Sequence, residues 1–505
     1  MKNILKLSLA ALGVFIFQSC DDYLDVNEDP NNPLVSQISP DKSLTGSQAL
    51  TYNRLSDRMN RLGTTMSGQW GGNVVSLGAA LSDETGFQIS STFYDDIWEH
   101  LYLRTANFTD IINYQDEKDW NNYKAVAYVM RSFYLQYIVD LYGDAPYTEM
   151  HLRNENFAAA YDDDFEVYKN LILDLDKAIA LIANASPESV QIGGDDAIFQ
   201  GNMTKWAQFA QTVKLRLALR GSSSNVAAES SYFTTILNSD FTGVTFLSEA
   251  VTINPGYSNE SSDKQNYFYS RYGKGIDGSA ADFATTPVAS KFLVDFMLDN
   301  ADGVNDGVDD ARLQAIYAPT TPIAYFGIEQ NLPFSSVPSG QGLNLLAQGQ
   351  GLLVSATQDG IIMTEAEARL LQAEFMLTTN PGIAQTMFEN AITSSYTYLG
   401  ITGGAVAYIA QVNTIAGLGW TGSNTDKMEA IITQKWLANG GINGIESWIE
   451  FTRTGYPSVP VPADVAEPTH PKRLLYPQSE ILANANNVPS QTKATAFSSG
   501  PFWAN

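Results

Sequence analysis

Several long stretches of this chain place apolar residues three or four positions apart, which is the spacing that lines one face of an α-helix. In the stretch Asp164–Ala183 the face is made by Phe165, Tyr168, Ile172, Leu175, Ile179 and Ile182. Asp163 and Glu166 stand at its start in the positions of a capping box. A chain dominated by such stretches buries its apolar surface mainly by packing helix against helix.

The same periodicity and its stop signals predict further helices. One covers Asn121–Tyr142 and stops at Gly143, with Pro146 beyond. The others are expected at Thr204–Arg220, at Glu365–Leu377 after the capping box Thr364-x-x-Glu367, after Pro381, and near Asp426–Asn439. These helices pair as hairpins of about tetratricopeptide size, without a regular repeat. We therefore predict an all-α fold, a scaffold of degenerate tetratricopeptide-like helix pairs.

Two segments lack helical periodicity. Residues 222–360 and 400–424 are rich in Gly, Ser, Asn, Thr and Pro. Long irregular segments inside a folded protein usually carry function or are disordered. We interpret them as a large, loop-rich variable region carried on the helical scaffold.

The first residues have the organisation of a secretory signal. Lys2 and Lys6 precede a short apolar run, Leu7–Phe17, and Ser19 stands directly before Cys20. Phe17-Gln18-Ser19-Cys20 is a relaxed lipobox, so residues 1–19 are predicted to be a signal peptide and Cys20 the lipidated residue. Cys20 is the single cysteine, which excludes an internal disulfide and a cysteine-based zinc site.

The rest of the chain divides into a tether and one domain. Residues 20–45 are polar and rich in turn-forming Asp, Asn and Pro, as in a spacer leading away from a membrane. Residues 46–505 are predicted to form a single helical domain with the two loop-rich insertions. No later stretch is long and apolar enough to span a bilayer, so the predicted contact with a membrane is the lipid at Cys20.

The charge of the chain excludes one class of partner. With 55 acidic and 29 basic residues, the formal net charge is −26. Phosphate backbones are bound through Lys and Arg, so we expect no nucleic-acid partner. An acidic surface is typical of a soluble secreted protein and carries no information on the fold.

Sequence motifs of catalysis are absent. The chain has no G-x-S-x-G, H-E-x-x-H, P-loop or G-x-G-x-x-G pattern, and its three histidines, His100, His151 and His470, lack ligand spacing. Paired carboxylates could indicate a glycosidase, but among 55 acidic residues some pair can always be chosen. We expect no enzymatic activity.

One acidic loop has the composition of a cation site. Asp302, Asn305, Asp306 and Asp309 would offer hard oxygen ligands to a structural Ca²⁺. Val304 departs from the EF-hand pattern, and the alternative is a solvated acidic turn. No other cofactor is indicated.

Aromatic residues in loop-like contexts are the candidates for ligand binding. Trp70 is followed by two glycines and by Asn73, and we predict that its ring faces a ligand with Asn73 as a polar partner. Tyr267, Tyr269 and Tyr272 are further candidates. For any one aromatic residue the alternative is packing in the core.

A set of motifs in fixed order resembles the SusD/RagB family of Bacteroidetes outer-membrane lipoproteins, in its SusD-like branch. The set begins at Cys20–Asn27 and continues with Asp140–Tyr147 and Lys214–Ala218. It ends with Trp448–Glu450, Arg453–Pro457, Arg473–Pro477 and Asn486–Val488. Thr452 and Ala311 depart from the pattern, where relatives often carry Arg and Pro.

The resemblance implies a function that the residues alone do not. It implies a nutrient-binding surface lipoprotein, which captures glycans, or peptides in some relatives. It also implies delivery to a TonB-dependent transporter of the SusC type. A surface glycoside hydrolase or an adhesin is the alternative.

Overall fold

The computed structural model describes residues 38–75, 80–152, 156–298 and 308–504. Within them the chain is mainly helical, and its strands form two short two-stranded sheets. The predicted all-α fold class is confirmed.

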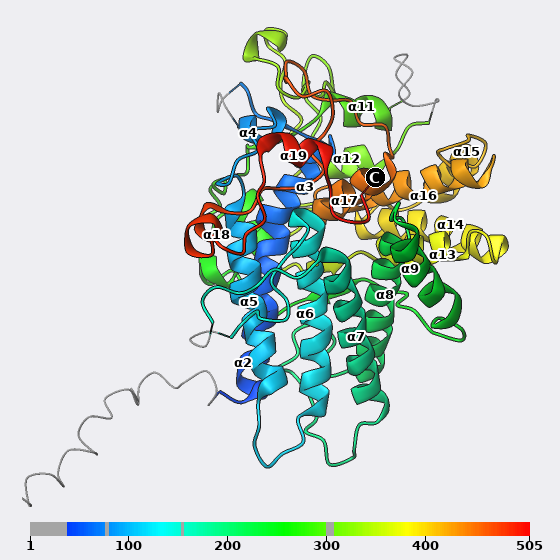
Figure 1. The fold of residues 1–505 in the computed structure, drawn as a ribbon. Helices are drawn as coiled ribbons and strands as arrows, with labels where there is room; N and C mark the ends of the chain where they lie inside the picture. The colour runs from blue at the N-terminus through cyan, green and yellow to red at the C-terminus, as the bar shows by residue number, and fades with distance from the viewer. Residues whose placement is uncertain (1–37, 76–79, 153–155, 299–307, 505) are drawn as a thin grey trace, which may run out of the picture.

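One group of long helices runs side by side through the lower half of the molecule (Figure 1). It consists of α2 (Pro40–Arg54), α5 (Asp95–Asn113), α6 (Asn121–Tyr142), α7 (Asp164–Ala183) and α8 (Met203–Gly221). Consecutive members from α5 to α8 pack against each other, as expected of tetratricopeptide-like pairs. α6 lies at the centre of this group and is buried along most of its length.

A second group of helices crosses the upper end of the first. It consists of α13 (Glu365–Met376), α14 (Pro381–Tyr398), α16 (Asn424–Asn439) and α17 (Gly444–Thr454). α17 packs on α3 (Asn60–Met66), where Gly63 and Gly444 let the two backbones meet. A Cβ atom on Gly63 would lie 2.2 Å from the Gly444 carbonyl oxygen, so this contact requires glycine.

The helices predicted from periodicity are present. α6 and α7 have the predicted bounds, and α14 begins at Pro381. The side chain of Asp163 accepts from the Glu166 N–H, and that of Thr364 accepts from the Glu367 N–H. These are the predicted N-caps, each satisfying a backbone donor that a helix start leaves unpaired.

The segments predicted to be irregular, 222–360 and 400–424, contain helices and short strands that were not expected. Those elements are α9 (Ala227–Ser239), β2 (Val251–Ile253), η4 (Ser262–Lys264), α10 (Tyr267–Tyr272), β3 (Pro287–Ala289), α11 (Lys291–Met297), α12 (Arg312–Ile316), η5 (Phe334–Ser336) and α15 (Ala405–Val412). α9 escapes detection because it buries only Phe233 and Ile236, too few residues to mark an apolar face.

The two sheets connect distant parts of the chain. β1 (Trp70–Gly72) pairs antiparallel with β3, with Trp70 opposite Ala289, and β2 pairs with β4 (Gly360–Met363). Both sheets join the helical scaffold to the loop-rich region. The remaining elements are η2 (Leu55–Met59), α4 (Ser82–Thr85), α18 (Gln478–Ala483) and α19 (Lys493–Ser498).

The N-terminal predictions are only partly covered by the structure. α2 begins at Pro40, so the predicted tether of residues 20–45 overlaps a helix at its end. The predicted signal peptide and Cys20 lie outside the described residues. Among the described helices, none combines the length and the apolar character needed to cross a bilayer.

Candidate ligand-binding face

Trp70 lies in the core. Its side chain has no exposed surface, and its ring packs 5.6 Å from that of Tyr272 within a cluster of buried apolar residues. The prediction that the indole faces a ligand is therefore corrected, because β1 turns this residue inward to pair with β3.

The glycines after Trp70 serve packing. A Cβ atom on Gly72 would lie 1.6 Å from the Ala80 carbonyl oxygen, and one on Gly71 would lie 3.1 Å from that of Ile328. The close backbone approach that we predicted does occur, but the partner is the protein's own chain and not a ligand.

Two other candidates are also buried. Asn73 is 2% exposed and its Nδ2 donates to the Thr285 carbonyl oxygen at 2.7 Å. Tyr272 has no exposed surface, and its hydroxyl donates to Asp57 Oδ1 at 2.8 Å. Both are corrected from ligand contacts to structural residues, since their polar atoms are satisfied inside the fold.

Tyr267 and Tyr269 keep part of their surface. Both lie on α10 and are half-buried. The side chain of Asn266 caps this helix by accepting from the Tyr269 N–H at 2.9 Å. α10 packs against η2, a π-helical segment between α2 and α3. Such segments occur frequently at functional sites, which makes the contact between α10 and η2 a candidate position for one.

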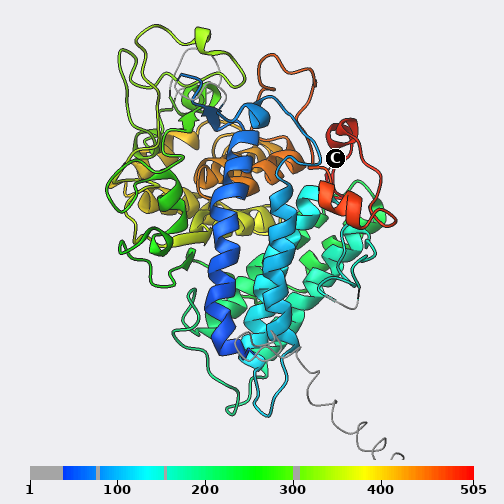
Figure 2. The ribbon, with the colours of Figure 1, turned by 90° about the vertical axis from the view of Figure 1, so that its left-hand side faces the viewer.

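Three arginines line the helix beside α10. Arg54, Arg58 and Arg61 follow each other at spacings of four and three, so one side of the α2–η2–α3 helix carries all of them. Arg58 binds Asp96 of α5 through Nε and Nη2, both at 2.9 Å, and Arg54 binds the same carboxylate. α2 and α5 lie next to each other on the side shown in Figure 2.

Aromatic rings and a fourth arginine complete this surface. The Arg58 guanidinium lies 4.0 Å from the centre of the Tyr94 ring, and that of Arg271 lies 4.4 Å from the centre of the Phe283 ring. Arg271 of α10 also pairs with Asp57 at 3.3 Å. The side chains of Arg54, Arg58 and Arg271 are 20%, 27% and 28% exposed. We call Arg54, Arg58, Arg61, Arg271, Tyr94, Phe283 and Tyr267 the arginine–aromatic face.

The electrostatics of this face keep its tyrosine neutral. Burial raises the pKa of Tyr94 well above its ordinary value, and the adjacent Glu84 carboxylate raises it further. The neutral Tyr94 hydroxyl accepts from Arg61 Nε at 2.8 Å and donates to Glu84. Tyr94 itself is only 4% exposed, so the ring surface open to a ligand is that of the half-buried Tyr267 and Phe283. Together with the arginines, these rings suit hydroxyl-rich or carboxylate-bearing ligands.

The sequence did contain a signal for this face. Three of the chain's few basic residues, Arg54, Arg58 and Arg61, recur at helical spacing within eight positions of a strongly acidic protein. Their partners, however, come from α4, α5 and α10, and no local pattern connects those segments.

The predicted cation loop is mostly outside the described residues. Asp302, Asn305 and Asp306 fall there, whereas Asp309 is described and exposed. Among the described residues, Asp144, Asp163 and Asp164 bring carboxylate oxygens within 4.8 Å of one another. Each accepts a backbone N–H, from Asp164, Glu166 and Phe502 respectively, so these carboxylates satisfy backbone donors of the fold.

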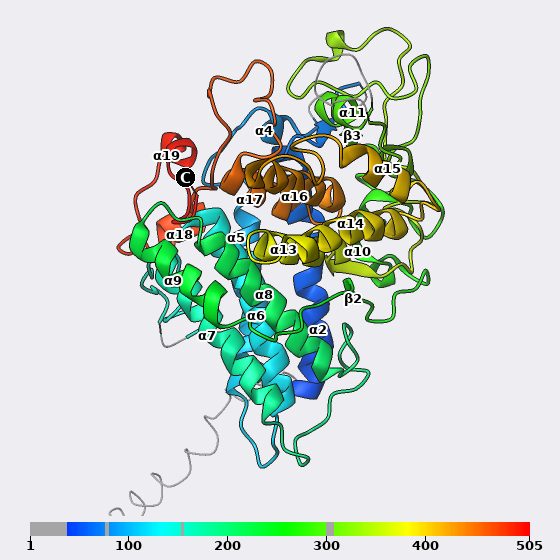
Figure 3. The same cartoon turned by 90° about the vertical axis from the view of Figure 1, so that its right-hand side faces the viewer.

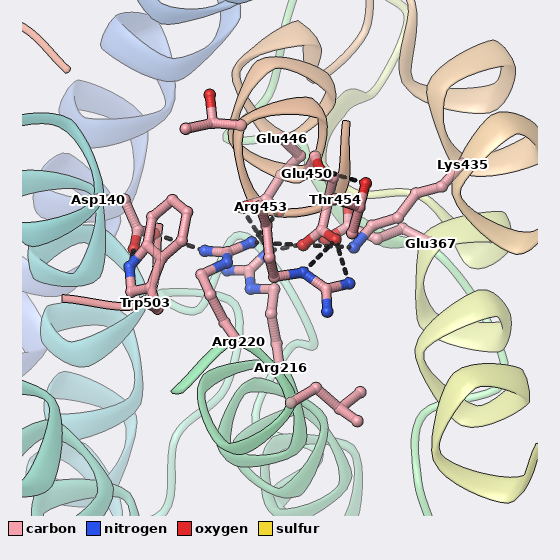
Figure 4. Close-up of polar contacts among 12 residues, drawn as sticks. Asp140, Arg216, Arg220, Glu367, Lys435, Glu446, Glu450, Arg453, Thr454 and Trp503 are labelled. Atoms are coloured by element: carbon pink, nitrogen blue, oxygen red, sulfur yellow. Dashed lines mark hydrogen bonds and ion pairs between the residues drawn. The ribbon is translucent and has the colours of Figure 1, made fainter. Parts of the chain in front are cut away.

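A network of buried ion pairs lies away from this face (Figure 4). Its cations are Arg216, Arg220, Lys435 and Arg453, and its carboxylates are Asp140, Glu367, Glu374, Glu446 and Glu450. It joins α6, α8, α13, α16 and α17 at the point where the two helix groups meet. Because its members are buried and paired with one another, we assign it to the fold and not to a reaction.

Comparison with known proteins gives consistent matches. The model of a SusD-like family, described as starch-binding and associating with the outer membrane, matches residues 33–477. A SusD-like protein from Bacteroides thetaiotaomicron VPI-5482 has a TM-score of 0.69 at 22% identity, covering 91% of this chain and 98% of that one. A chitin-binding SusD homolog from Flavobacterium johnsoniae has a TM-score of 0.68 at 20% identity, covering 91% and 98%. No protein of curated function matches significantly.

Proposed function

Because this chain belongs to the SusD-like family of starch-binding proteins that associate with the outer membrane, we propose that it is a nutrient-binding protein of the cell surface. It captures oligosaccharides and delivers them to a TonB-dependent transporter of the SusC type. It binds its ligand without chemically changing it. Oligopeptides are the alternative ligand class.

The observation that carries this proposal is the family match over residues 33–477, which takes in both helix groups and the loop-rich region. Two of the similar solved structures are named for binding chitin. The arginine–aromatic face supports the same role, because ring planes next to fixed donors are the groups that hold a sugar ring.

A binding screen tests the ligand class directly. Calorimetric titration of residues 21–505 with maltoheptaose, chitohexaose and a mixed oligopeptide library should give heat with at least one oligosaccharide. Heat from the peptides alone would reassign the ligand class. Shorter sugars appearing on incubation with starch or chitin would show a hydrolase and overturn the proposal.

The arginine–aromatic face should contribute directly to affinity. We expect Tyr267→Ala and Arg271→Gln each to weaken oligosaccharide binding about tenfold, since truncation of binding anchors commonly costs 1–2 kcal/mol. Lys264→Ala is the matched control, because this residue precedes α10, its side chain is 55% exposed, and its ammonium pairs with Glu260 at 2.7 Å. Equal affinities for the wild type and all three variants would exclude the arginine–aromatic face as the binding site.

The lipid anchor is a separate prediction. Cys20→Ala should release the protein from the membrane fraction, because acyl chains contribute about 0.8 kcal/mol per buried CH₂ group and no described helix can replace them. Fractionation of cells expressing the variant, followed by immunoblotting, measures this. A variant that still sediments with outer membranes, after a high-salt wash, would contradict lipidation at Cys20.

A further inference from the structure

A groove lies along the helix pair α13–α14, and its lining contains none of the four arginines of the arginine–aromatic face. Its volume is about 520 Å³, within the range of small-ligand sites. The two helices and the neighbouring β2 are seen together in Figure 3. The lining residues used below are Glu365, Arg369, Asn390, Thr393, Ser394, Thr397 and Tyr398.

One wall of the groove is a polar side of α14. Asn390, Thr393, Ser394 and Thr397 follow each other at positions i, i+3, i+4 and i+7, which places them on one face of the helix. The opposite side of α14 carries Phe388, Ala391 and Ile392 into the core. Three of the four polar side chains, Asn390, Thr393 and Thr397, are exposed, so their polar atoms are accessible to a ligand in the groove.

The hydroxyl groups on this wall are oriented by the helix. Thr393 Oγ1 donates to the Glu389 carbonyl oxygen at 3.0 Å, and Thr397 Oγ1 donates to that of Thr393 at 2.9 Å. Ser394 Oγ donates to the Ala391 carbonyl oxygen at 2.9 Å. Each hydroxyl hydrogen is thus engaged inside the helix, and each oxygen keeps lone-pair capacity to accept from a ligand hydroxyl.

The facing wall is polar but carries no net charge. Arg369 Nε binds Glu365 Oε1 at 2.7 Å, and Arg369 Nη2 donates to the Ser248 carbonyl oxygen at 3.1 Å. The side chains of Arg369 and Glu365 are 18% and 32% exposed. Because the guanidinium and the carboxylate neutralise each other, this wall favours a neutral ligand with hydroxyl groups over an ionic one.

An aromatic ring is also part of the groove lining. Tyr398 is 38% exposed, and it lines both this groove and a smaller adjoining cavity. The smaller cavity is also lined by Ser56 of η2 and Phe268 of α10. The groove therefore neighbours the helices that carry the arginine–aromatic face, but its own lining shares no residue with that face.

We propose that the α13–α14 groove is a second binding site, which takes a neutral sugar ring against Tyr398 and the hydroxyls of α14. The proposal rests on oligosaccharide binding as the proposed function and adds a second contact for longer chains. An oligosaccharide long enough to contact both sites would bind more tightly than one that contacts the arginine–aromatic face alone, even if its contacts with that face are the same.

The test compares variants of the groove in the full mature chain. Thr393→Leu fills the groove from an exposed helix position, and Tyr398→Ala removes the ring. We expect each to lower the affinity for maltoheptaose or chitohexaose, whichever the wild type binds, about tenfold, with an unchanged melting temperature. Phe157→Ala is the control, because this 80% exposed ring lines a separate cavity of about 510 Å³.

The outcomes separate the two proposals. Groove variants that bind like wild type, while Tyr267→Ala or Arg271→Gln weakens binding, would overturn the second site and leave the proposed function standing. Loss of affinity in Phe157→Ala equal to that in the groove variants would also overturn it, since aromatic surface in general would then be responsible. A wild-type chain that binds neither sugar would overturn the proposed function and the second site together.

Discussion

Replacing Arg220 with methionine is expected to lower the free energy of unfolding by about 3–5 kcal/mol, the usual cost of removing one partner from a buried ion cluster. The Arg220 side chain has no exposed surface. Its guanidinium binds Asp140, Glu446 at 2.7 Å and Glu450 at 3.0 Å, so the substitution leaves three buried carboxylates without their shared cation. Urea denaturation followed by circular dichroism measures the loss.

The charge balance of the network explains why this cation matters. Four cations face five carboxylates, and burial raises the pKa of Asp140 to about 6. Glu450 stands in contrast: despite its burial, the neighbouring Arg453, Lys435 and Arg220 hold its pKa well below the ordinary value. Removing Arg220 would shift this balance toward unpaired negative charge.

An exposed ion pair provides the control for this prediction. Lys169 binds Glu166 on the surface of α7, with side chains 29% and 52% exposed. Lys169→Met should change stability by less than about 1 kcal/mol, because solvent already screens the pair. If Arg220→Met were no more destabilising than Lys169→Met, the network would not be holding the helix groups together.

The scaffold was predictable wherever a helix buries one apolar face. α6 and α7 have apolar residues at regular spacing, and their bounds followed from the sequence. α2 was not found, because it buries Ser47, Gln48 and Thr51, whose polar groups bond within the fold. Apolar periodicity cannot detect a helix that packs through satisfied polar side chains.

The binding residues were less predictable, and Trp70 shows why. Its flanking glycines suggested an open loop, but the surroundings of Trp70 come from β3 and from Tyr272, about two hundred positions later in the chain. The arginine–aromatic face is likewise formed by residues that lie far apart in the sequence, since Arg58 binds Asp96 of α5 and Asp57 binds Arg271 of α10. Such long-range contacts leave no local pattern in one sequence.

Acidification should destabilise the protein through His470. Burial lowers the pKa of His470 from 6.5 to about 4. Its ring packs edge-on against Phe87 and Phe451, with centroids 5.3 Å and 4.8 Å away, a surrounding that disfavours the charged imidazolium. The unfolded chain therefore takes up the proton first as the pH falls below 6.5.

The sign and size of the effect follow from these two pKa values. A histidine whose folded pKa lies below its unfolded pKa adds full stability above pH 6.5 and loses it as the pH falls toward 4. The expected loss from this residue is about 2 kcal/mol between pH 7 and pH 5, and about 3 kcal/mol by pH 4. Urea denaturation of the wild type at these pH values gives the total, to which buried carboxylates also contribute.

His470→Gln isolates the contribution of this residue, since glutamine does not titrate. Between pH 7 and pH 5, the free energy of unfolding of this variant should fall by about 2 kcal/mol less than that of the wild type. This difference does not depend on how stable the variant is at pH 7. His100→Gln is the comparison variant, because burial also lowers the pKa of His100 and this variant reports the contribution of that second histidine. Parallel pH profiles for the wild type and His470→Gln would mean that the ring is protonated in the folded protein, and that the loop holding it between Phe87 and Phe451 opens to water.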